Sequence, residues 1–425
     1  MSKICCCSTI IFIIIWMHAV KGVKELVFVN IVWRHGDRSY IKSYPNDPYK
    51  NGSIWKNGPG ELTNIGIKQQ YELGKFLRSR YDIILSKAYR PQEIYVRSTD
   101  KDRTIMSAQS NMAGLYPPVT SDELWNGSNT EWYPVPIHVV PLESDNLLRY
   151  PIRGCPKYEK VMHDIHNSPW FIAHEKNYSS FYGYIQKNTG STYRYNFSNI
   201  WEVEDNLFCL KSNNFSLPHW VKNEDLQKLK FLNSLDMGVM FSDVDYKYRS
   251  VISQMQGGVL LKEMIQNMTQ HINNISKYST IAYSAHDTTL TALLVTLGNY
   301  DWIQPEYASC IMIELYKDSD KYFVEIFYKK RNGTKALKFF NCNISCPFDD
   351  FVTIAKQLIP DDYGKICGKH QEPFSCNKIV LIAVCCILAL FILIFIIYVS
   401  WKCSKKAKRD FPYSIVETTD DDGPI

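Results

Sequence analysis

The feature that most restricts how this chain can fold is a long C-terminal stretch without a charged side chain, Ile379–Trp401. A helix rises about 1.5 Å per residue, so a stretch of this length crosses the ~30 Å hydrocarbon core of a bilayer. A single basic residue, Lys378, precedes it directly, whereas a basic cluster follows it within residues 402–409. The positive-inside rule therefore predicts a type I membrane protein with a cytosolic tail, residues 402–425. A removable GPI signal is the alternative, but such signals end in apolar residues and this chain ends in polar ones.

The N-terminus carries a second apolar segment, which is too short to cross a bilayer. Lys3 is followed by the uncharged run Ile4–Met17 and then by small residues near Ala19. One positive charge, a short apolar stretch and small residues in this order are typical of a secretory signal peptide, here residues 1–22. A buried N-terminal strand or helix is the alternative.

Between the two apolar ends, residues 23–377 are expected to be lumenal or extracellular. Over the whole chain hydrophobic residues make up 45%, charged residues make up 21%, and the formal net charge is +5. This composition excludes a disordered chain and does not favour a nucleic-acid binder. Nine Asn-x-Ser/Thr sequons agree with N-glycosylation of a secreted surface. They are at Asn51, Asn126, Asn177, Asn196, Asn214, Asn267, Asn274, Asn332 and Asn343.

Seven cysteines lie in the same segment, and an oxidising compartment would allow six of them to pair. Their spacing alone does not assign the pairs. Cys376 lies beside the apolar stretch and is predicted to be the unpaired one. The other six are Cys155, Cys209, Cys310, Cys342, Cys346 and Cys367.

Strand–loop–helix units recur along this segment and predict an α/β fold. The nearly continuous apolar run Leu26–Trp33 is typical of a strand buried on both faces of a parallel sheet, and a helix is predicted over Leu62–Tyr81. The same order recurs twice, in strand 93–96 with helix 99–115 and in strand 280–284 with helix 288–297. We therefore predict a mainly parallel central sheet flanked by helices, formed by residues 23–140 and 256–377.

Residues 141–255 differ from the rest of the segment. Prolines, aromatic residues and polar helical stretches replace the apolar strands there. We predict that these residues form a mostly helical cap domain, inserted into the α/β core and covering the ends of its strands.

Each of the three predicted strands is followed by residues suited to binding phosphate. The first leads into the segment Arg34–Arg38 (Arg-His-Gly-Asp-Arg), the second is followed by Arg103 in the next helix, and the third leads into His286-Asp287. Ligands of open α/β sheets bind beyond the carboxyl ends of the strands, where helix N-termini favour anions. The rigid fork of arginine binds two oxygens at once. We therefore expect a phosphate site at this edge.

The histidines and the aspartate indicate that phosphate is also transferred. A neutral nitrogen of His35 can attack phosphorus, and the nearby arginines should lower the pKa of its imidazole, keeping it neutral in mildly acidic medium. Gly36 is expected to leave room for the substrate to approach closely. Asp287 is suited to protonate the departing alcohol and then to activate water. The alternative for His35 is an ordinary histidine at a strand end.

A possible metal pair is present in the cap segment. His163 and His166 are three residues apart and would lie on one face of a helix. The sequence places no third ligand beside them, so we expect a solvated helix face there.

Two motifs together are similar to those of the histidine acid phosphatases, branch 2 of the histidine phosphatase superfamily. They are Arg-His-Gly-Asp-Arg-Ser at 34–39 and Ser-Ala-His-Asp-Thr-Thr at 284–289. The likeness to the lysosomal and prostatic group of this family covers almost the whole of residues 23–377. One departure is Tyr40, where the family usually has proline or a small residue.

The resemblance implies site roles, disulfides and partners. It implies His35 as the nucleophile and Asp287 as the proton donor, without a metal or cofactor, and a set of phosphate ligands comprising Arg34, Arg38, Arg103 and His286. It implies three disulfides, namely Cys155–Cys367, Cys209–Cys310 and Cys342–Cys346. It also implies a homodimer whose contact region includes Trp132 and His138.

We therefore expect an acid phosphatase that hydrolyses phosphate monoesters through a phosphohistidine, anchored in the lysosomal or plasma membrane. In the tail, Tyr413 is followed three residues later by Val416, a pattern that a sorting adaptor can bind as an extended peptide, although short patterns also arise by chance. The alternatives are a narrower phosphatase for inositol phosphates or AMP, a mutase, and a catalytically silent receptor ectodomain.

Overall fold

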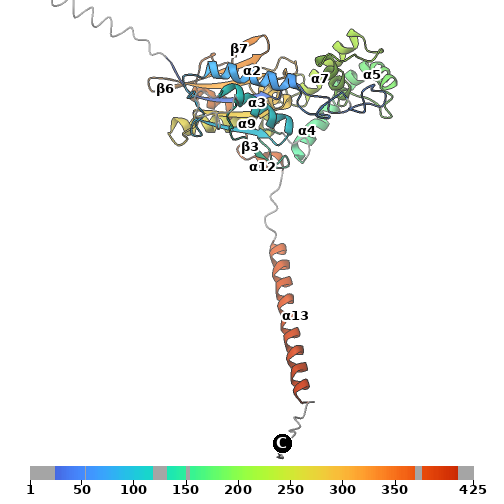
Figure 1. Ribbon diagram of the computed structural model, residues 1–425, viewed down its shortest axis with the longest axis vertical. Helices are drawn as coiled ribbons and strands as arrows, with labels where there is room; N and C mark the ends of the chain where they lie inside the picture. The colour runs from blue at the N-terminus through green and yellow to red at the C-terminus, as the bar shows by residue number, and fades with distance from the viewer. Residues whose placement is uncertain (1–23, 53, 118–131, 150–153, 369–375, 410–425) are drawn as a thin grey trace, which may run out of the picture. The chain divides into compact units, whose positions relative to one another are not determined.

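The computed structural model describes residues 24–52, 54–117, 132–149, 154–368 and 376–409. The chain divides into two units, residues 1–369 and residues 370–425. The predicted signal peptide, the sequon at Asn126 and the tail motif with Tyr413 lie outside the described residues. The second unit contains helix α13 (Cys376–Arg409), of which Val380–Lys405 is long and apolar enough to cross a membrane (Figure 1).

The first unit is built on one mixed sheet with the strand order β3-β2-β4-β1-β5-β6-β7, and β8 pairs with β6. Strands β3, β2, β4 and β1 run parallel to one another, whereas β5, β6, β7 and β8 pair in antiparallel fashion. The strands are β1 (Glu25–Arg34), β2 (Ile94–Thr99), β3 (His138–Val140), β4 (Thr280–Ala285), β5 (Cys310–Asp318), β6 (Lys321–Lys330), β7 (Gly333–Leu337) and β8 (Cys346–Pro347).

The expectation of a mainly parallel sheet is thus wrong for half of the strands. Strands β5, β6 and β7 follow one another within residues 310–337 and are separated by only two residues at each turn. Such short connections can join antiparallel neighbours only, because a parallel pair needs a long crossover. The strands predicted from the sequence each precede a helix, whereas β5, β6 and β7 precede none.

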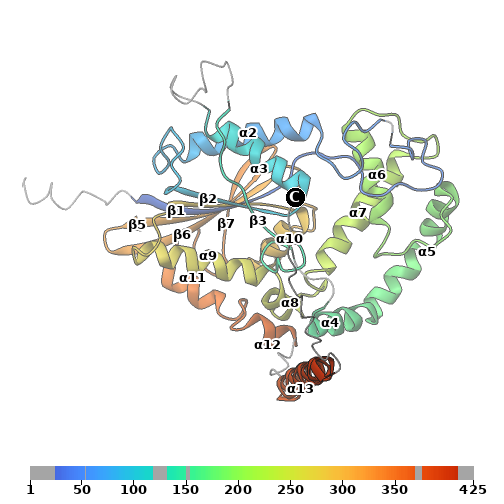
Figure 2. The ribbon, with the colours of Figure 1, turned by 60° about the horizontal axis from the view of Figure 1, so that its bottom comes forward.

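Helices cover both faces of the sheet (Figure 2). On one face lie α2 (Asn64–Arg80) and α3 (Asp102–Leu115), and on the other α9 (Gly257–Ile272), α10 (Asp287–Thr296) and α11 (Phe348–Ala355). Residues of β1 alternate between the two layers, as a strand with two buried faces requires. Val29, Ile31 and Trp33 join the apolar cluster beneath α2 and α3, and Phe28 and Val32 join the opposite one. The predicted strand–helix units are confirmed to within a few residues.

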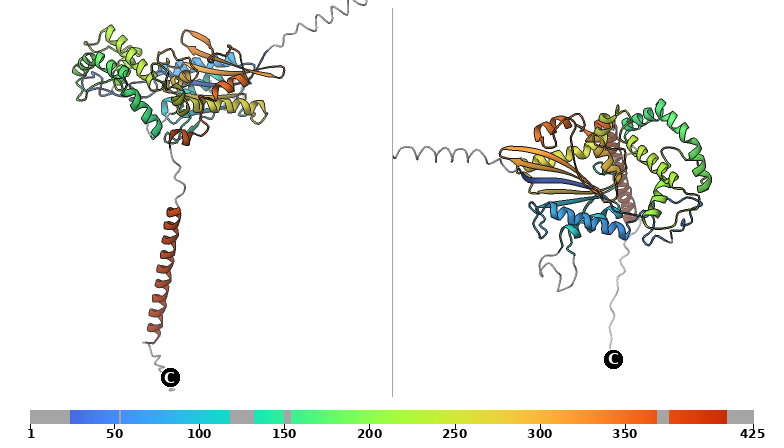
Figure 3. Two further views of the ribbon diagram at one scale, coloured as in Figure 1. Left: turned by 180° about the vertical axis from the view of Figure 1, so that it is seen from behind. Right: turned by 90° about the horizontal axis from the view of Figure 1, so that it is seen from above.

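The segment predicted to be helical contains α4 (Pro156–His166), α5 (Pro169–Thr189), α6 (Trp201–Ser212), α7 (Asn223–Val239) and α8 (Arg249–Met255). Figures 2 and 3 show α5, α6 and α7 to one side of the sheet, beyond the carboxyl end of β1. These helices share an apolar cluster of their own, with Tyr182, Ile185, Val203, Leu207 and Leu229 fully buried. The short α12 (Tyr363–Cys367) contacts α4 and α8.

Two of the three expected disulfides are present. Cys155–Cys367 joins the start of α4 to the end of α12, and Cys342–Cys346 closes a short loop. The expected Cys209–Cys310 bond is not formed, and both of these thiols are buried and free. The Cys209 sulfur lies 3.7 Å from Arg38 Nη1 and packs with Tyr40 and Trp55, whereas Cys310 packs in a different cluster, beneath α2 and α3.

One predicted glycosylation site is incompatible with the fold. Asn267 on α9 is only 5% exposed, and its amide donates hydrogen bonds to Asn30 Oδ1 at 3.0 Å and to the Tyr283 hydroxyl at 2.9 Å. A glycan cannot be attached to this side chain in the folded protein. The asparagines of the other described sequons are exposed, namely Asn51, Asn177, Asn196, Asn214, Asn274, Asn332 and Asn343.

We predict that glycopeptide mapping of the folded protein finds no glycan at Asn267. Replacing this residue by leucine should lower the free energy of unfolding by about 1–3 kcal/mol, because the Asn30 and Tyr283 oxygens lose a buried donor. Denaturant unfolding of the Asn267→Leu variant measures this, with Asn177→Gln on the exposed face of α5 as the control. Equal stability of the two variants would contradict the buried network.

Candidate active site

The residues that follow the parallel strands meet at one cavity. Arg34 at the end of β1 is in register with Ala285 of β4, and Ser98 of β2 with Ser284 of β4. The segments after these strands therefore emerge side by side. They line a cavity of about 760 Å³ together with residues of the helical segment. Five of the six predicted site residues line it, namely His35, Arg38, Arg103, His286 and Asp287.

His35 is held as a neutral imidazole with a defined tautomer. Its Nδ1 lies 2.8 Å from the Gly36 carbonyl oxygen, and a carbonyl oxygen only accepts, so Nδ1 carries the proton. The other nitrogen, Nε2, is left with a lone pair. Burial lowers the pKa of His35 well below its ordinary value, and the positive charges of Arg103, Arg34 and Arg38 lower it further. This confirms the direction of the expected shift, although burial is the larger cause.

Gly36 has a different role from the one expected. A Cβ on this residue would lie 2.3 Å from the Gly66 carbonyl oxygen, in the first turn of α2. The missing side chain therefore lets the segment after β1 pack against α2 and does not serve the approach of a substrate. The Gly36 N–H is also used in packing, since it donates to Ser107 Oγ on α3 at 3.1 Å.

Arg34 lies behind the cavity and contacts Asp287. Its Nη2 is 2.8 Å from Asp287 Oδ2, its Nη1 donates to the Pro305 carbonyl at 2.5 Å, and its guanidinium stacks 4.1 Å above the Tyr307 ring. Arg34 is not among the cavity-lining residues. Burial by itself would raise the pKa of Asp287, but the positive charges of Arg34 and Arg38 outweigh it and lower the pKa below its ordinary value.

Arg38 is paired with a residue that sequence analysis missed. Asp205 on α6 accepts from both terminal nitrogens of Arg38, at 2.7 and 3.1 Å, and also from the Ile41 N–H at 2.9 Å. A bidentate pair of this kind fixes the plane of the guanidinium. The helical segment thus orients an arginine that comes from the core. Nothing in the local sequence distinguishes Asp205 from other acidic residues of α6.

Arg103 and His286 complete the cavity wall nearest His35. Among the described residues, Arg103 has no hydrogen bond or ion pair of its own, and burial and the charge of Arg38 lower its pKa to about 10. The His286 ring lies 5.6 Å from the His35 ring, with its Nε2 2.9 Å from Thr99 Oγ1. Burial first, and then Arg103, lower the pKa of His286 to about 3. Both imidazoles are therefore neutral.

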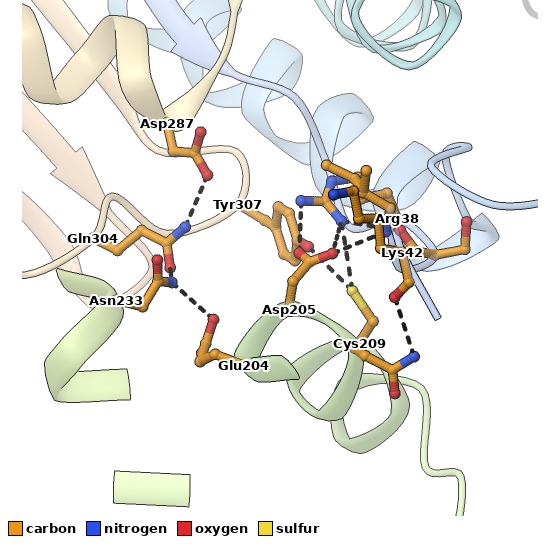
Figure 4. Close-up of polar contacts among 12 residues, drawn as sticks. Arg38, Lys42, Glu204, Asp205, Cys209, Asn233, Asp287, Gln304 and Tyr307 are labelled. Carbon is orange, nitrogen blue, oxygen red and sulfur yellow. Dashed lines mark hydrogen bonds and ion pairs between the residues drawn. The ribbon is translucent and has the colours of Figure 1, made fainter. Parts of the chain in front are cut away.

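A hydrogen-bonded chain connects Asp287 to the helical segment (Figure 4). The Gln304 amide donates to Asp287 Oδ2 at 2.8 Å. The amide nitrogen of Asn233 on α7 lies 3.2 Å from Gln304 Oε1 and 2.8 Å from Glu204 Oε2. The Asn233 amide nitrogen can only donate, so Glu204 Oε2 and Gln304 Oε1 both accept from it. Glu204 thereby orients Asn233, and Asn233 in turn orients Gln304. Burial and the nearby Asp205 raise the pKa of Glu204 to about 7.

Comparison with known proteins gives the same family. Residues 25–329 match the model of the histidine phosphatase superfamily (branch 2). The chain is 38% identical to lysosomal acid phosphatase of Xenopus laevis over 94% of its length and 91% of that protein. It is 40% identical to prostatic acid phosphatase of Bos taurus over 81% of its length and 88% of that protein.

Among solved structures, the apo form of Hafnia alvei phytase superposes with a TM-score of 0.61. The alignment covers 81% of this chain and 98% of the phytase, at 15% sequence identity. At this identity the likeness concerns the fold alone.

The charges around His35 lead to a prediction about its titration. Replacing Arg103 by methionine removes the positive charge that, after burial, does most to lower the pKa of His35. The imidazole should then protonate at a higher pH, a change that NMR titration of the ring resonances measures. Lys101→Met removes an exposed cation nearby and is the control. An unchanged titration in Arg103→Met would show that the charge of Arg103 does not contribute to keeping the ring neutral.

Proposed function

This chain belongs to branch 2 of the histidine phosphatase superfamily and is an acid phosphatase, and we propose that it hydrolyses phosphate monoesters by way of a phosphohistidine on His35. The observation that carries the proposal is the state of His35 itself. The hydrogen bond to the Gly36 carbonyl holds the proton on Nδ1, so the lone pair of Nε2 is available to attack phosphorus.

Three arginines, of which Arg34 and Arg38 are buried and Arg103 is half-buried, supply the positive charge for the transferred group. Arg34 and Arg38 are each paired with one carboxylate, whereas Arg103 has none among the described residues. The part of the cavity beside His35 therefore has an excess of positive charge, which an incoming phosphate group neutralises. We assign Arg38, Arg103 and His286 to direct contact with its oxygens. Arg34 was expected to bind phosphate as well, and we propose that it acts mainly by orienting Asp287.

Asp287 is proposed as the proton donor for the departing alcohol. The arginines lower its pKa, and a bound phosphate neutralises their charge and so raises the pKa of Asp287. Below about pH 6 a phosphate monoester still carries one proton, which the substrate can bring to Asp287. As Nε2 attacks, the bond between phosphorus and the ester oxygen breaks and the alcohol leaves with that proton.

The second half of the reaction releases phosphate. Asp287, now ionised, takes a proton from a water molecule as its oxygen attacks the phosphohistidine. The phosphorus–nitrogen bond breaks, its electron pair returns to His35 Nε2, and inorganic phosphate leaves. The arginines stabilise the charge on the phosphoryl oxygens in both halves.

We further propose that residues 141–255 act as a cap domain and that the catalytic unit lies in the lysosomal lumen or outside the cell. The pairing of Asp205 with Arg38 supports the first proposal. The apolar helix α13 and the lysosomal acid phosphatase relatives support the second. A homodimer, expected through Trp132 and His138, and a sorting adaptor at Tyr413 and Val416 stay predictions.

The proposed intermediate leads to a direct test. Enzyme quenched during turnover of labelled p-nitrophenyl phosphate should carry label that is lost in acid and kept in alkali, as expected for phosphohistidine. His35→Ala should lose both the label and at least about 10³-fold in kcat while keeping its circular dichroism spectrum, because the nitrogen proposed to attack phosphorus is removed. Label on a serine or an aspartate would rule out the mechanism.

The donor role of Asp287 leads to a second prediction. Asp287→Ala should slow alkyl phosphates by about 10²–10⁴-fold, the usual contribution of a general acid. It should slow p-nitrophenyl phosphate much less in the first step, because p-nitrophenolate leaves without a proton. Measurement of kcat/KM for both substrates tests this, since this ratio reports the steps up to the departure of the alcohol. Equal losses for the two substrates would argue against proton donation by Asp287.

A further inference from the structure

The cavity extends well beyond the residues of the phosphate site. From His35 and Asp287 it continues along α7 toward α4. Helix α7 lines it with Asn233, Asp236 and Met237, and Met240 directly after the helix also lines it. Residues with this spacing share one face of a helix. The mechanism above uses only the end of this face at Asn233, so the function of the remainder is unassigned.

Asp236 is the unusual member of this face. It is 8% exposed, it lines the cavity, and its carboxyl group makes no hydrogen bond or ion pair with any described residue. A buried carboxyl without a partner costs free energy of folding. Asp236 therefore does not serve the stability of the fold, and its free oxygens are available to a ligand.

The position of Asp236 along α7 shows which part of a substrate it would meet. Asn233 connects to Asp287 through Gln304, so the Asn233 end of the face lies nearest the reacting group. Asp236 is three residues farther and thus lies about 4.5 Å along the helix axis from Asn233. Met240 follows about 6 Å beyond Asp236.

Beyond Asp236 the cavity wall contains a group of large non-polar side chains. They are Met240 and Phe241, together with Tyr158 and Met162 of α4, and the polar Glu159, His163 and His166 of α4 also line the cavity. Tyr158 is next to Met240, since its hydroxyl donates to the Met240 carbonyl at 2.9 Å. An alcohol that leaves from Asp287 can therefore reach one carboxyl group and then a non-polar part of the wall.

We propose that Asp236 binds a hydrogen-bond donor, a hydroxyl or an amino group, on the alcohol part of the substrate. The apolar wall then holds the non-polar remainder of that alcohol. The preferred substrates are phosphate monoesters of alcohols that carry such a donor a few bonds from the ester oxygen. This inference rests on the proposed function, because it takes phosphate to be bound at His35.

The ionisation of Asp236 decides which donor it prefers. Burial, and next the negative charge of Glu175 on α5, raise its pKa to about 7. Tyr158 of α4 and Tyr182 of α5 are the other titratable groups that interact with it, and His163 and His166 of α4 line the same cavity. Below pH 7 the neutral carboxyl group suits a hydroxyl. Above pH 7 the carboxylate suits an ammonium group.

The test compares matched substrates on the full-length enzyme in detergent. The probes are ω-hydroxyalkyl and ω-aminoalkyl phosphates with two to six carbons, each measured against the plain alkyl phosphate of equal length. At one chain length we expect kcat/KM at pH 5 to be about tenfold higher for the hydroxyl compound than for the plain alkyl phosphate. At pH 8 we expect the same advantage for the amino compound. Asp236→Leu should abolish both preferences, whereas Asp236→Asn should keep only the first. Glu224→Gln, which neutralises an exposed acid on the same helix, is the control.

Two results would overturn the inference. One is a preference for the hydroxyl or amino compound that has the same size in wild type and in Asp236→Leu. The other is a wild-type enzyme that hydrolyses alkyl phosphates but prefers neither compound at any chain length. Failure to hydrolyse every alkyl phosphate would instead overturn the proposed function. Thermal unfolding separates a binding role from a structural one, since loss of an unpartnered carboxyl should raise the Tm of Asp236→Leu at pH 8. If Asp236→Leu does not fold, Asp236→Asn tests the inference at pH 8. It should lose the preference for the amino compound, and a retained preference would overturn the inference.

Discussion

Three guanidinium groups, two buried and one half-buried, lie within one small region, and this is the constraint on which the rest of the site depends. Like charges in a poorly solvated interior repel strongly, so each needs a partner or a ligand. Asp287 and Asp205 compensate Arg34 and Arg38, and burial together with the arginines keeps His35 and His286 neutral. One positive charge is then left over at Arg103. An anion that enters the cavity completes the balance of charge.

The same balance explains why the site needs residues from two parts of the chain. The core supplies the arginines, the histidines and Asp287, all of which follow parallel strands or begin the next helix. The helical segment supplies Asp205 and the pair of Glu204 and Asn233 that orients Gln304. Without these contacts Arg38 would lose its fixed plane and Asp287 one of its donors. The helical segment therefore supplies side chains that belong to the chemical site.

Along helix α7 the cavity has two regions that differ in the polarity and hydrogen bonding of their side chains. Near Asp287 the side chains are polar and hydrogen bonded, since charge develops there during the reaction. Farther along, Asp236 is left unpartnered and large non-polar side chains form part of the wall. An unpartnered buried carboxyl group lowers the stability of the fold. Residues that lower stability but line a cavity open to ligands are typical of functional positions. Exposed acids such as Glu224 on the same helix carry no such cost.

Local sequence was sufficient to predict the strand–helix units and the meeting of the residues that follow the parallel strands. The reason is that the residues after parallel strands all lie at the same edge of the sheet. It was not sufficient for the antiparallel half of the sheet, where β5, β6 and β7 precede no helix. It also gave wrong expectations for Gly36, Asn267 and the pair of Cys209 and Cys310. Each of these depends on which segments pack together.

The sequence by itself therefore determined the family, the chemistry-bearing residues and the order of the elements, because these follow from neighbours along the chain. Only the tertiary structure decided the partners of those residues. Asp205 meets Arg38 across 167 positions of sequence, and Asn233 meets Gln304 across 71. No local pattern encodes such contacts, because they arise only when the helical segment packs against the core. The buried polar groups between the two must then find partners on the other side.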